Sequence, residues 1–448
     1  MLRMDGWCHE STVLINNSSQ FDRTNEFIEV KITVSERQIT DPVREVRVIY
    51  KTAWNIWERL IPCQVNGVER AGDKVIFRVA FFADIPANSI SRYGIVYGNP
   101  NALPQQENLT LYVRNKENVT EIDNPAYVIS IDRKTGQISG VSYKYFRTGF
   151  LIPIELSPVN LIQPGVSIQF EDGDWVTAAD SNPESLTVEG GTVAFRHKSS
   201  RVLKHSSIKK GVCVSTELLF PASQPYVHIR EKVTFEEDTP LYGLRLAGHR
   251  FPDGVYSHFT FRPTTKPALK KTEVEEMGHL LIDQAYTKNL PEGTVLSGFM
   301  PLLMPWTAML NIHRNRWFTQ VRYLLDWKTQ NVKGTTIPEY RAATYLMREN
   351  GCYESALMPV YTKNINDKRN LTVIPAGTEF SYDIAMFFSP FEEVVWGMKM
   401  DHIGRVMNQP LTVQVHPRPV NSVGEWDEHP VFTLTGKRDC DYQTSGVR

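Results

Sequence analysis

Short stretches in which apolar and polar residues alternate dominate the first quarter of the chain. The segment EFIEVKITV alternates apolar Ile28, Val30, Ile32 and Val34 with polar residues. VREVRVIYK, DKVIFRVAFFADI and SRYGIVYGNP follow at short spacing, with Asn, Gly, Asp and Pro between them. Alternation with a period of two is typical of half-buried strands, and several short strands with regular turn signals predict an antiparallel sandwich. We expect this first domain to span residues 1–121.

Strand patterns continue through most of the remaining chain. AYVISIDRKTGQISGVSYK predicts a hairpin around a Lys-Thr-Gly turn. The pattern in PYVHIREKVTFEE is the most regular, with Val227, Ile229 and Val233 on one face. Glu231 falls on the same apolar face, so we expect it either to pair with a cation or to line a cleft. We expect a large second domain over residues 122–408 and a C-terminal extension over residues 409–448.

One helix is predicted late in the chain, in SPFEEVVWGMKMDHIGRVM. Ser389 is a suitable N-cap, Pro390 occupies the first helical position, and Glu392 completes a capping box. An apolar stripe follows at helical spacing. The expected fold class is therefore all-β with this single helix.

Two successive stretches carry a resemblance to a known arrangement of domains. FFADIPANSISRYGIVYGNPNA ends the first block, and NPAYVISIDRKTGQISGV begins the second. Their succession resembles large carbohydrate-active enzymes in which a small β-sandwich precedes a galactose-mutarotase-like supersandwich. The β-rich C-terminal halves of α-mannosidase-like glycosidases and the sandwich domains of several polysaccharide lyases have this order. The resemblance covers roughly residues 11–390 and implies an N-terminal β-sandwich, a large antiparallel supersandwich and a carbohydrate ligand.

The resemblance does not fix a reaction. Its motifs, such as Ala83–Pro86 and Thr135–Gly136, mark turns and strand ends. Nothing in the sequence resembles the α/β catalytic domain of the mannosidases or the α/α toroid of many lyases. Either the chemistry lies on the sandwich, or the chain is an accessory part of a larger system.

Composition and charge limit the classes of molecule that the protein is expected to bind. Lys and Arg number 49 against 50 Asp and Glu, so the formal net charge of -1 gives no general attraction to nucleic acid or to an anionic membrane. Aromatic residues make up 11% of the chain and suit both a large β core and a sugar-binding cleft. No apolar run approaches the roughly 20 residues of a membrane span. The composition does not predict an oligomeric state.

The cysteines and the N-terminus bear on location. The five cysteines are scattered and odd in number, with no C-x-x-C, so neither a disulfide framework nor a zinc site is predicted. The N-terminal residues lack the apolar core of a signal peptide. From the carbohydrate resemblance we expect an extracellular or periplasmic protein, with a cytoplasmic location as the alternative.

The first candidate site is GHRFPDGVYSH. Pro-Asp-Gly is a turn signal, so LYGLRLAGHRF and VYSHFTFRP are expected to be neighbouring antiparallel strands. Tyr256 and His258 would then share a strand face opposite Phe259, with His249 and Arg250 across from it. Tyr and His suit proton transfer, and Arg250 or Arg262 suits bidentate contact with a carboxylate. A solvated polar strand face is the alternative.

The second candidate site is NIHRNRWFTQVRYLLDWK. It brings basic groups beside tryptophans, which suits an acidic sugar, because guanidinium groups bind carboxylates and indoles stack on ring faces. The alternative is a pair of amphipathic strands whose arginines pair with Asp326. The candidate substrate-binding residues are His313, Arg314, Arg316, Trp317 and Trp327.

The third candidate is an acidic loop. FEDGDWVTAADSNPESL contains Glu171, Asp172, Asp174, Asp180 and Glu184. Such a loop can bind Ca²⁺ through oxygen ligands, but the spacing of an EF-hand is missing. His249, His258 and His279 also follow no known ligand spacing. We therefore expect no metal site and no cofactor, and no sequence feature supports a structural Ca²⁺.

These residues give three hypotheses for function. The leading one is β-elimination in an acidic, uronic-acid-containing polysaccharide, with His249, Tyr256 or His258 as base or acid and Arg250, Arg314 or Arg316 neutralising the developing charge. The second is a non-catalytic sugar-binding or scaffold portion of a larger glycosidase. The third is a hydrolase or epimerase that uses Glu231 with a histidine.

Overall fold

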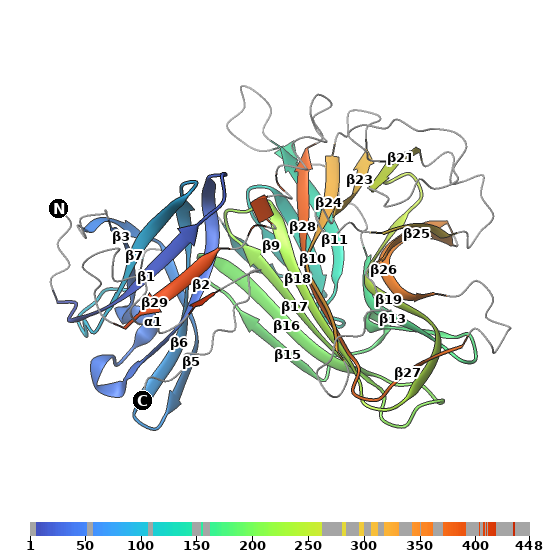
Figure 1. The fold of residues 1–448 in the computed structure, drawn as a ribbon, viewed down its shortest axis with the longest axis horizontal. Coiled ribbons are helices and arrows are strands. Elements are labelled where there is room, and N and C mark those ends of the chain that lie inside the picture. Colours follow the sequence, from blue (N-terminus) through green and yellow to red (C-terminus); the bar gives the residue numbers. More distant parts are fainter. Residues whose placement is uncertain are drawn as a thin grey trace.

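The chain forms two lobes built almost entirely of antiparallel strands (Figure 1), which confirms the all-β fold class. The structure is a computed structural model. It describes residues 6–51, 57–105, 111–145, 154–155, 162–261, 280–283, 295–299, 306–311, 318–330, 343–349, 351–361, 371–390, 403, 406–407, 409, 411–417 and 433–434.

The first lobe is a sandwich of two sheets. Its six-stranded sheet has the order β30-β29-β1-β7-β3-β4, and its three-stranded sheet has the order β2-β6-β5. The alternating apolar residues of β2, such as Val30 and Ile32, pack against those of β1, such as Val13 and Ile15. The strands are β1 (His9–Asn17), β2 (Arg23–Ser35), β3 (Arg47–Lys51), β4 (Trp57–Ile61), β5 (Cys63–Ala71), β6 (Lys74–Ile85), β7 (Ser89–Tyr97), β29 (Thr412–His416) and β30 (Thr433–Leu434).

Three sheets of five, seven and nine strands make up the second lobe. The five-stranded sheet contains β8 (Tyr112–Asn115), β9 (Val119–Asp123), β10 (Tyr127–Asp132), β11 (Ile138–Tyr145) and β12 (Ile154–Glu155). The seven-stranded sheet contains β13 (Ile162–Phe170), β14 (Trp175–Thr177), β19 (Thr239–Pro252), β22 (Val295–Phe299), β25 (Ala343–Glu349), β26 (Cys352–Tyr361) and β27 (Thr372–Ile374). The nine-stranded sheet contains β15 (Ser185–Glu189), β16 (Ala194–Leu203), β17 (Val212–Pro221), β18 (Tyr226–Phe235), β20 (His258–Phe261), β21 (Leu280–Asp283), β23 (Trp306–Asn311), β24 (Phe318–Gln330) and β28 (Glu379–Pro390).

Along β16 to β18, the nine-stranded sheet separates an apolar interior from a polar outer face, whereas an apolar cluster that includes Val321, Tyr323 and Phe387 covers the outer side of β24 and β28. On β18, Ile229 and Val233 point inward and join cores that also contain residues of the five- and seven-stranded sheets. His228 and Arg230 alternate with them and contact Asp383 of β28 on the outer face of the sheet. The period of two that the sequence shows on this strand is therefore the division between interior and outer face.

Helical residues are few. Among the described residues, the regular helices are α1 (Pro42–Glu45) and the 3₁₀ turns η1 (Glu36–Gln38) and η2 (Ala178–Asp180), and Ile403, Val406 and Met407 are also helical. The late helix was predicted to begin at Ser389, which is wrong, because β28 continues through Pro390 and pairs there with β24. The predicted stripe over residues 391–402 lies outside the described residues. Within the described part of the chain, no helix has the length and apolarity needed to cross a bilayer.

An ion-pair network joins the two lobes. The Arg196 side chain on β16 is 2% exposed, and its Nη2 lies 2.7 Å from Oε2 of Glu29 on β2, which is 1% exposed. Arg196 Nη1 also lies 3.1 Å from Oε2 of Glu189 on β15. Nearby, Oε1 of Gln64 on β5 accepts hydrogen bonds from the backbone N–H groups of Val193 and Ala194 at 3.0 and 2.9 Å. The outer face of the nine-stranded sheet is thus fixed to the first lobe by charged and polar groups.

We expect Arg196→Ala to lower the free energy of unfolding by about 3–5 kcal/mol, because it leaves Glu29 as a buried charge whose other cation, Arg78, is at 3.9 Å. Arg70→Ala, in the exposed pair with Glu36, is the matched control and should cost less than about 1 kcal/mol. Urea unfolding at pH 7, followed by tryptophan fluorescence, measures both losses. Equal losses would contradict the dependence on burial.

Candidate functional site

The stretch GHRFPDGVYSH crosses between two sheets. β19, which contains His249 and Arg250, pairs with β13, β26 and β27 in the seven-stranded sheet. β20, which contains His258, pairs with β21 and β23 in the nine-stranded sheet. The predicted hairpin between these strands is wrong, because the Pro-Asp-Gly turn passes from one sheet of the sandwich to the other.

Tyr256 lies in the core between the sheets. It is fully buried, packs edge-on against Phe251 at 4.8 Å between ring centroids, and belongs to the same cluster as Phe259. It therefore does not oppose Phe259 across a strand, as predicted, because it precedes the regular part of β20. Its hydroxyl donates to Gln320 Oε1 at 2.7 Å and lies 2.8 Å from the Tyr143 hydroxyl. Burial raises the pKa of Tyr256 well above its ordinary value, so the phenol stays neutral.

His249 is fully buried beside a bulge in β19. Its Nδ1 donates to the carbonyl of Ala247 at 2.9 Å, and Nη1 of Arg322 donates to the same carbonyl at 3.0 Å. Ala247 has φ +50°, a left-handed conformation that is uncommon for a residue with a Cβ, and the β19–β26 register shifts at this point. Burial, with the nearby Arg322 charge, lowers the pKa of His249 to about 3, so the imidazole is neutral at physiological pH.

The other predicted site residues make contacts of their own, away from the side chains of Tyr256 and His249. The Arg250 side chain is 41% exposed, and its Nη2 lies 2.9 Å from Oε2 of Glu354. His258 is buried, with Nδ1 2.9 Å from the Ser257 hydroxyl. Trp327 is half-buried and stacks against Tyr382 at 6.3 Å between centroids. Four predicted substrate-binding residues, His313, Arg314, Arg316 and Trp317, lie outside the described residues, as do Arg262 and His279.

Glu231 is a buried carboxyl group on the inner face of β18. The Thr216 hydroxyl donates to its Oε1 at 2.9 Å, whereas Oε2 has no hydrogen-bond partner within the described residues. Both polar side-chain atoms of Gln137 are likewise unpaired there. A Cβ placed on Gly165, at φ +66°, would lie 3.3 Å from Glu231 Oε1 and 3.4 Å from Gln137 Oε1, so both side chains flank this glycine. Burial raises the pKa of Glu231 to about 7, against the opposing hydrogen bond of Thr216 and the charge of Arg201.

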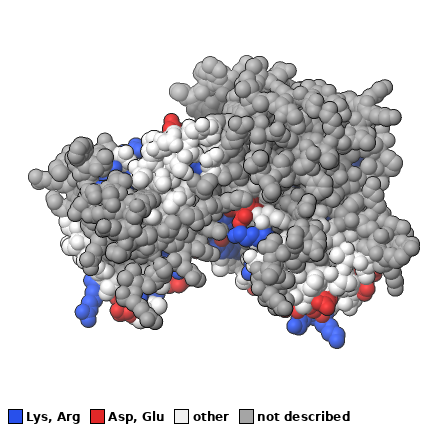
Figure 2. All heavy atoms as spheres, in the orientation of Figure 1, with Lys and Arg blue, Asp and Glu red and all other residues white. Residues whose placement is uncertain are grey.

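A cluster of charged side chains lies on the outer face of the nine-stranded sheet. Figure 2 shows a hollow between the two lobes, with charged side chains gathered on its wall where β16 to β18 lie in Figure 1. Glu217 on β17, 18% exposed, pairs through Oε2 with Lys198 Nζ at 3.0 Å and through Oε1 with Arg230 Nη1 at 3.4 Å. Lys198 is 40% exposed. Arg230 Nε and His228 Nδ1 each lie 3.1 Å from a carboxylate oxygen of Asp383 on β28.

Both carboxylates of this cluster are held ionised. Burial alone would raise the pKa of Asp383, but Arg230 and His228 outweigh it and hold that pKa well below its ordinary value. At Glu217, burial alone would also raise the pKa. The charges of Arg196, Arg230 and Lys198 outweigh burial and lower the pKa. Two permanently charged acceptors held by fixed cations can bind hydroxyl groups, but they are poor proton donors.

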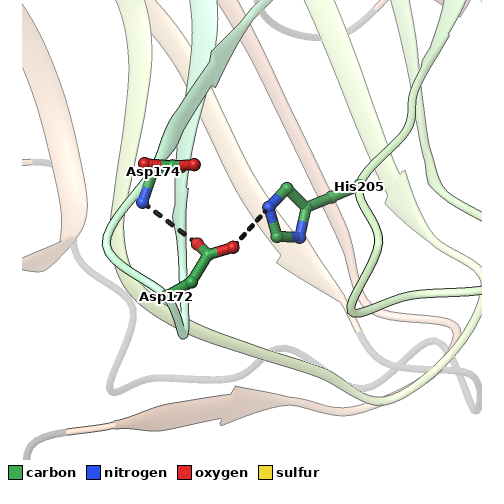
Figure 3. Close-up of side chains that lie close together, drawn as sticks. All are labelled: Asp172, Asp174 and His205. Carbon is green, nitrogen blue, oxygen red and sulfur yellow. Dashed lines mark hydrogen bonds and ion pairs between the residues drawn. The ribbon is translucent and has the colours of Figure 1, made fainter.

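A third arrangement involves the acidic loop. Asp172 and Asp174 lie in the turn between β13 and β14, and His205 lies in the loop after β16 (Figure 3). His205 Nε2 is 2.9 Å from Asp172 Oδ2, and one ligand atom from each of the three residues lies within 4.8 Å of the others. Of the described residues, these could hold a metal ion.

Sequence patterns indicated some of these residues and not others. The outward face of β18, with His228 and Arg230, was visible as polar alternation, but nothing local identified Glu217 and Asp383 as partners from neighbouring strands. Asp172 and Asp174 were visible as an acidic loop. His205 was missed, because it is far from them in the chain and meets them only when the two sheets pack together.

Comparisons with known proteins give structural similarities only. No protein-family model and no curated protein matches the sequence. The structure is similar to an α-mannosidase from Enterococcus faecalis V583, with 10% identity, covering 92% of this chain and 47% of that chain at a TM-score of 0.49. It is similar to a glycosyl hydrolase family 38 protein from Enterococcus faecalis, with 8% identity, covering 96% and 51% of the two chains at a TM-score of 0.49.

A galactose 1-epimerase from Lactobacillus acidophilus NCFM is similar over 63% of this chain and 98% of its own, with 8% identity and a TM-score of 0.32. The chain spans about half the length of the two Enterococcus proteins. At identities and TM-scores this low, none of these similarities assigns an activity or a site residue to the chain.

The raised pKa of Glu231 predicts a pH-dependent stability difference between the wild type and Glu231→Gln. The unfolded carboxyl ionises near pH 4.5 and the folded one near pH 7, so the wild type loses stability relative to the variant as the pH rises through this window. We expect the variant to gain on the order of 3 kcal/mol over the wild type between pH 4.5 and pH 7.5, with no further gain above it. Urea unfolding at several pH values measures this difference.

Glu217→Gln provides a control of opposite sign. The pKa of Glu217 is lowered, so its carboxylate contributes stability that is present above the ordinary pKa and lost as the pH falls. This variant should be less stable than the wild type at pH 7, with the difference shrinking below about pH 4.5. The same pH trend in both variants would contradict the assignment.

Proposed function

We propose that this protein is carbohydrate-active and that its described part binds a sugar chain in the hollow between the lobes, on the outer face of the nine-stranded sheet. The observation that carries the proposal is the cluster of ionised side chains around Glu217 and Arg230 that borders this hollow. Small-molecule sites occur preferentially at domain interfaces, where a few fixed polar groups set the orientation of the ligand. An extracellular or periplasmic location, where polysaccharides are met, belongs to this proposal.

The polar groups of the cluster suit hydroxyl groups. Glu217 and Asp383 are acceptors whose charge does not depend on pH near neutrality, and Lys198 and Arg230 are donors beside them. A sugar with adjacent hydroxyls can donate to a carboxylate and accept from the neighbouring cation. Because ion pairs already fix these side chains, little conformational entropy is lost on binding.

The charge balance of the cluster favours an uncharged sugar over an acidic one. Together with the lobe-joining ion pairs that continue it, the cluster contains the cations Arg78, Arg196, Lys198 and Arg230 and the anions Glu29, Glu189, Glu217 and Asp383. Four positive and four negative groups leave no excess charge to attract a polyanion. The acidic glycan inferred from the sequence therefore gains no support from these residues.

Lys198→Ala is expected to weaken binding of a neutral oligosaccharide about three- to tenfold, because it removes a half-exposed donor at the edge of the cluster. A panel of neutral gluco-, manno- and galacto-oligosaccharides, with uronic-acid oligosaccharides beside them, identifies the ligand by isothermal titration calorimetry. The wild type and variant are then compared on that ligand.

Lys134→Ala is the matched control, since Lys134 is an exposed lysine in the turn between β10 and β11. It should leave binding unchanged. Equal affinity of all three proteins, or binding to none of the neutral sugars, would count against a sugar site in this hollow. Tighter binding of the uronic-acid series would instead favour the acidic glycan.

Cleavage of an acidic polysaccharide by β-elimination is a narrower proposal with less support. It assigns proton transfer to His249, Tyr256 or His258 and charge neutralisation to Arg250, Arg314 or Arg316, of which the last two lie outside the described residues. His249 and Tyr256 are fully buried and hydrogen-bonded to protein groups, whereas a catalytic base must reach a substrate proton directly or through one water. Binding without turnover agrees better with this burial.

Glu231 favours a second candidate, a hydrolase or epimerase that uses this carboxyl group with a histidine. A buried carboxyl with a pKa of about 7 can donate and accept a proton near neutral pH, which is what a general acid or base requires. Its Oε2 has no hydrogen-bond partner among the described residues and could exchange a proton with a substrate. The proposal requires an opening of the sandwich that admits substrate to the inner face of β18.

Activity assays separate these proposals. Uronic-acid polysaccharides are followed by the ultraviolet absorbance of the unsaturated product, and neutral glycosides and free sugars by product release and anomeric exchange. For the second candidate we expect Glu231→Gln to abolish turnover, about a hundredfold or more, while Tyr256→Phe does not. Absorbance that disappears in Tyr256→Phe would support β-elimination. Silence across the whole panel would leave binding as the function.

A further inference from the structure

The arrangement of Asp172, Asp174 and His205 spans the two sheets of the large lobe. Asp172 and Asp174 end a hairpin of the seven-stranded sheet, and His205 follows a strand of the nine-stranded sheet. We propose that these three side chains bind a divalent metal cation, which joins the two sheets at this end of the sandwich. The site is independent of the proposed sugar site.

The imidazole of His205 is held in place by groups outside the acidic turn. The side chain is 10% exposed, and its ring stacks on Phe170 with 4.2 Å between centroids and 4° between planes. Nδ1 accepts a hydrogen bond from the Ser207 backbone N–H at 3.2 Å and lies 2.8 Å from the Ser207 hydroxyl. These contacts leave Nε2 directed at Asp172, as Figure 3 shows, where a bound cation would replace the Nε2 proton.

The two carboxylates lack another source of positive charge. Among the residues that the structure describes, neither Asp172 nor Asp174 pairs with a lysine or arginine, and Asp172 lies beside the imidazole of His205. The turn also brings the two aspartates together, since the Asp174 backbone N–H donates to Asp172 Oδ1 at 3.0 Å. A divalent cation would compensate two adjacent negative charges at once.

The donor set and its spacing indicate the class of metal. Imidazole nitrogen with carboxylate oxygen suits Zn²⁺ and Mn²⁺, whereas Ca²⁺ prefers oxygen ligands alone. In an octahedral site of the kind that Mn²⁺ takes, neighbouring ligands at right angles with bonds of about 2.1 Å are about 3.0 Å apart. Nε2 of His205 and Oδ2 of Asp172 are 2.9 Å apart, which agrees with this spacing. Both aspartates are exposed, so water can complete the coordination.

A metal bound here would stabilise the fold. Phe170 and the neighbouring Leu203 and Ile208 belong to the core between the sheets, so the ligands sit directly over the edge of that core. A cation that binds the folded chain more tightly than the unfolded chain raises the free energy of unfolding in proportion to the logarithm of its concentration over its dissociation constant. The expected signature is a thermal shift that grows with metal concentration.

The test uses the untagged full chain after treatment with EDTA and dialysis. ZnCl₂ and MnCl₂ are titrated by calorimetry, and thermal unfolding is recorded with and without each metal. We expect one binding event per chain and a rise of a few °C in Tm. Asp172→Asn and Asp174→Asn should each weaken binding about tenfold or more and remove most of the thermal shift. Both positions are exposed, so these variants should fold. His205→Gln tests the third ligand by removing its imidazole.

Glu171→Gln is the matched control, because it removes an equal charge from the same turn outside the three-residue cluster. It should keep the full affinity and thermal shift. CaCl₂ should bind more weakly than ZnCl₂ or MnCl₂. The proposal is overturned if neither transition metal binds the wild type. It is equally overturned if the aspartate variants bind as tightly as Glu171→Gln, which would mark adventitious surface binding.

Discussion

The buried guanidinium of Arg196 fixes the relation between the two lobes. It faces Glu29 across the boundary between the lobes and Glu189 on the adjacent strand of its own sheet. Such groups are costly to desolvate, and each one is tolerated only because the others compensate it. The pairing therefore demands one particular placement of the first lobe against the nine-stranded sheet. Directional polar contacts hold this placement, together with the apolar packing of Phe82 on β6 against the core of the second lobe.

The nine-stranded sheet divides two kinds of chemistry between its faces. Its outer carboxylates, Glu217 and Asp383, are surrounded by cations and remain ionised. Its inner carboxyl, Glu231, has little compensation and favours the protonated form up to about pH 7. Carboxyl groups on the two faces of one sheet thus differ in charge near neutral pH, and the difference comes from the cations around them on each face. We therefore place sugar binding on the outer face first and proton transfer by Glu231 on the inner face second.

The sequence predicted the strands well and their partners poorly. Alternation on β2 and β18 is a local property, so the faces of Val30 and Ile229 could be assigned without the fold. The turn after β19 also looked like a hairpin turn, but local sequence cannot tell whether the next strand stays in the same sheet. The sequence did not predict that Tyr256 is buried or that His205 lies beside Asp172. Both facts depend on how the sheets stack, which local sequence does not determine. The residue type of a polar side chain does not show whether that side chain is buried in the core or exposed to solvent.

The pairing of β29 with β1 has a consequence for how the chain acquires its structure. Val413 and Val415 complete the core that Val13 and Ile15 begin, although some 400 residues separate them. During synthesis the first lobe therefore emerges with an open edge on β1, and unpaired edges invite association with other chains. Closing so long a loop is slow, since contacts distant in sequence carry a large entropic barrier. The first lobe leaves the ribosome long before β29 and is completed only when β29 pairs with β1, and a chaperone that shields the β1 edge would be most useful in that interval.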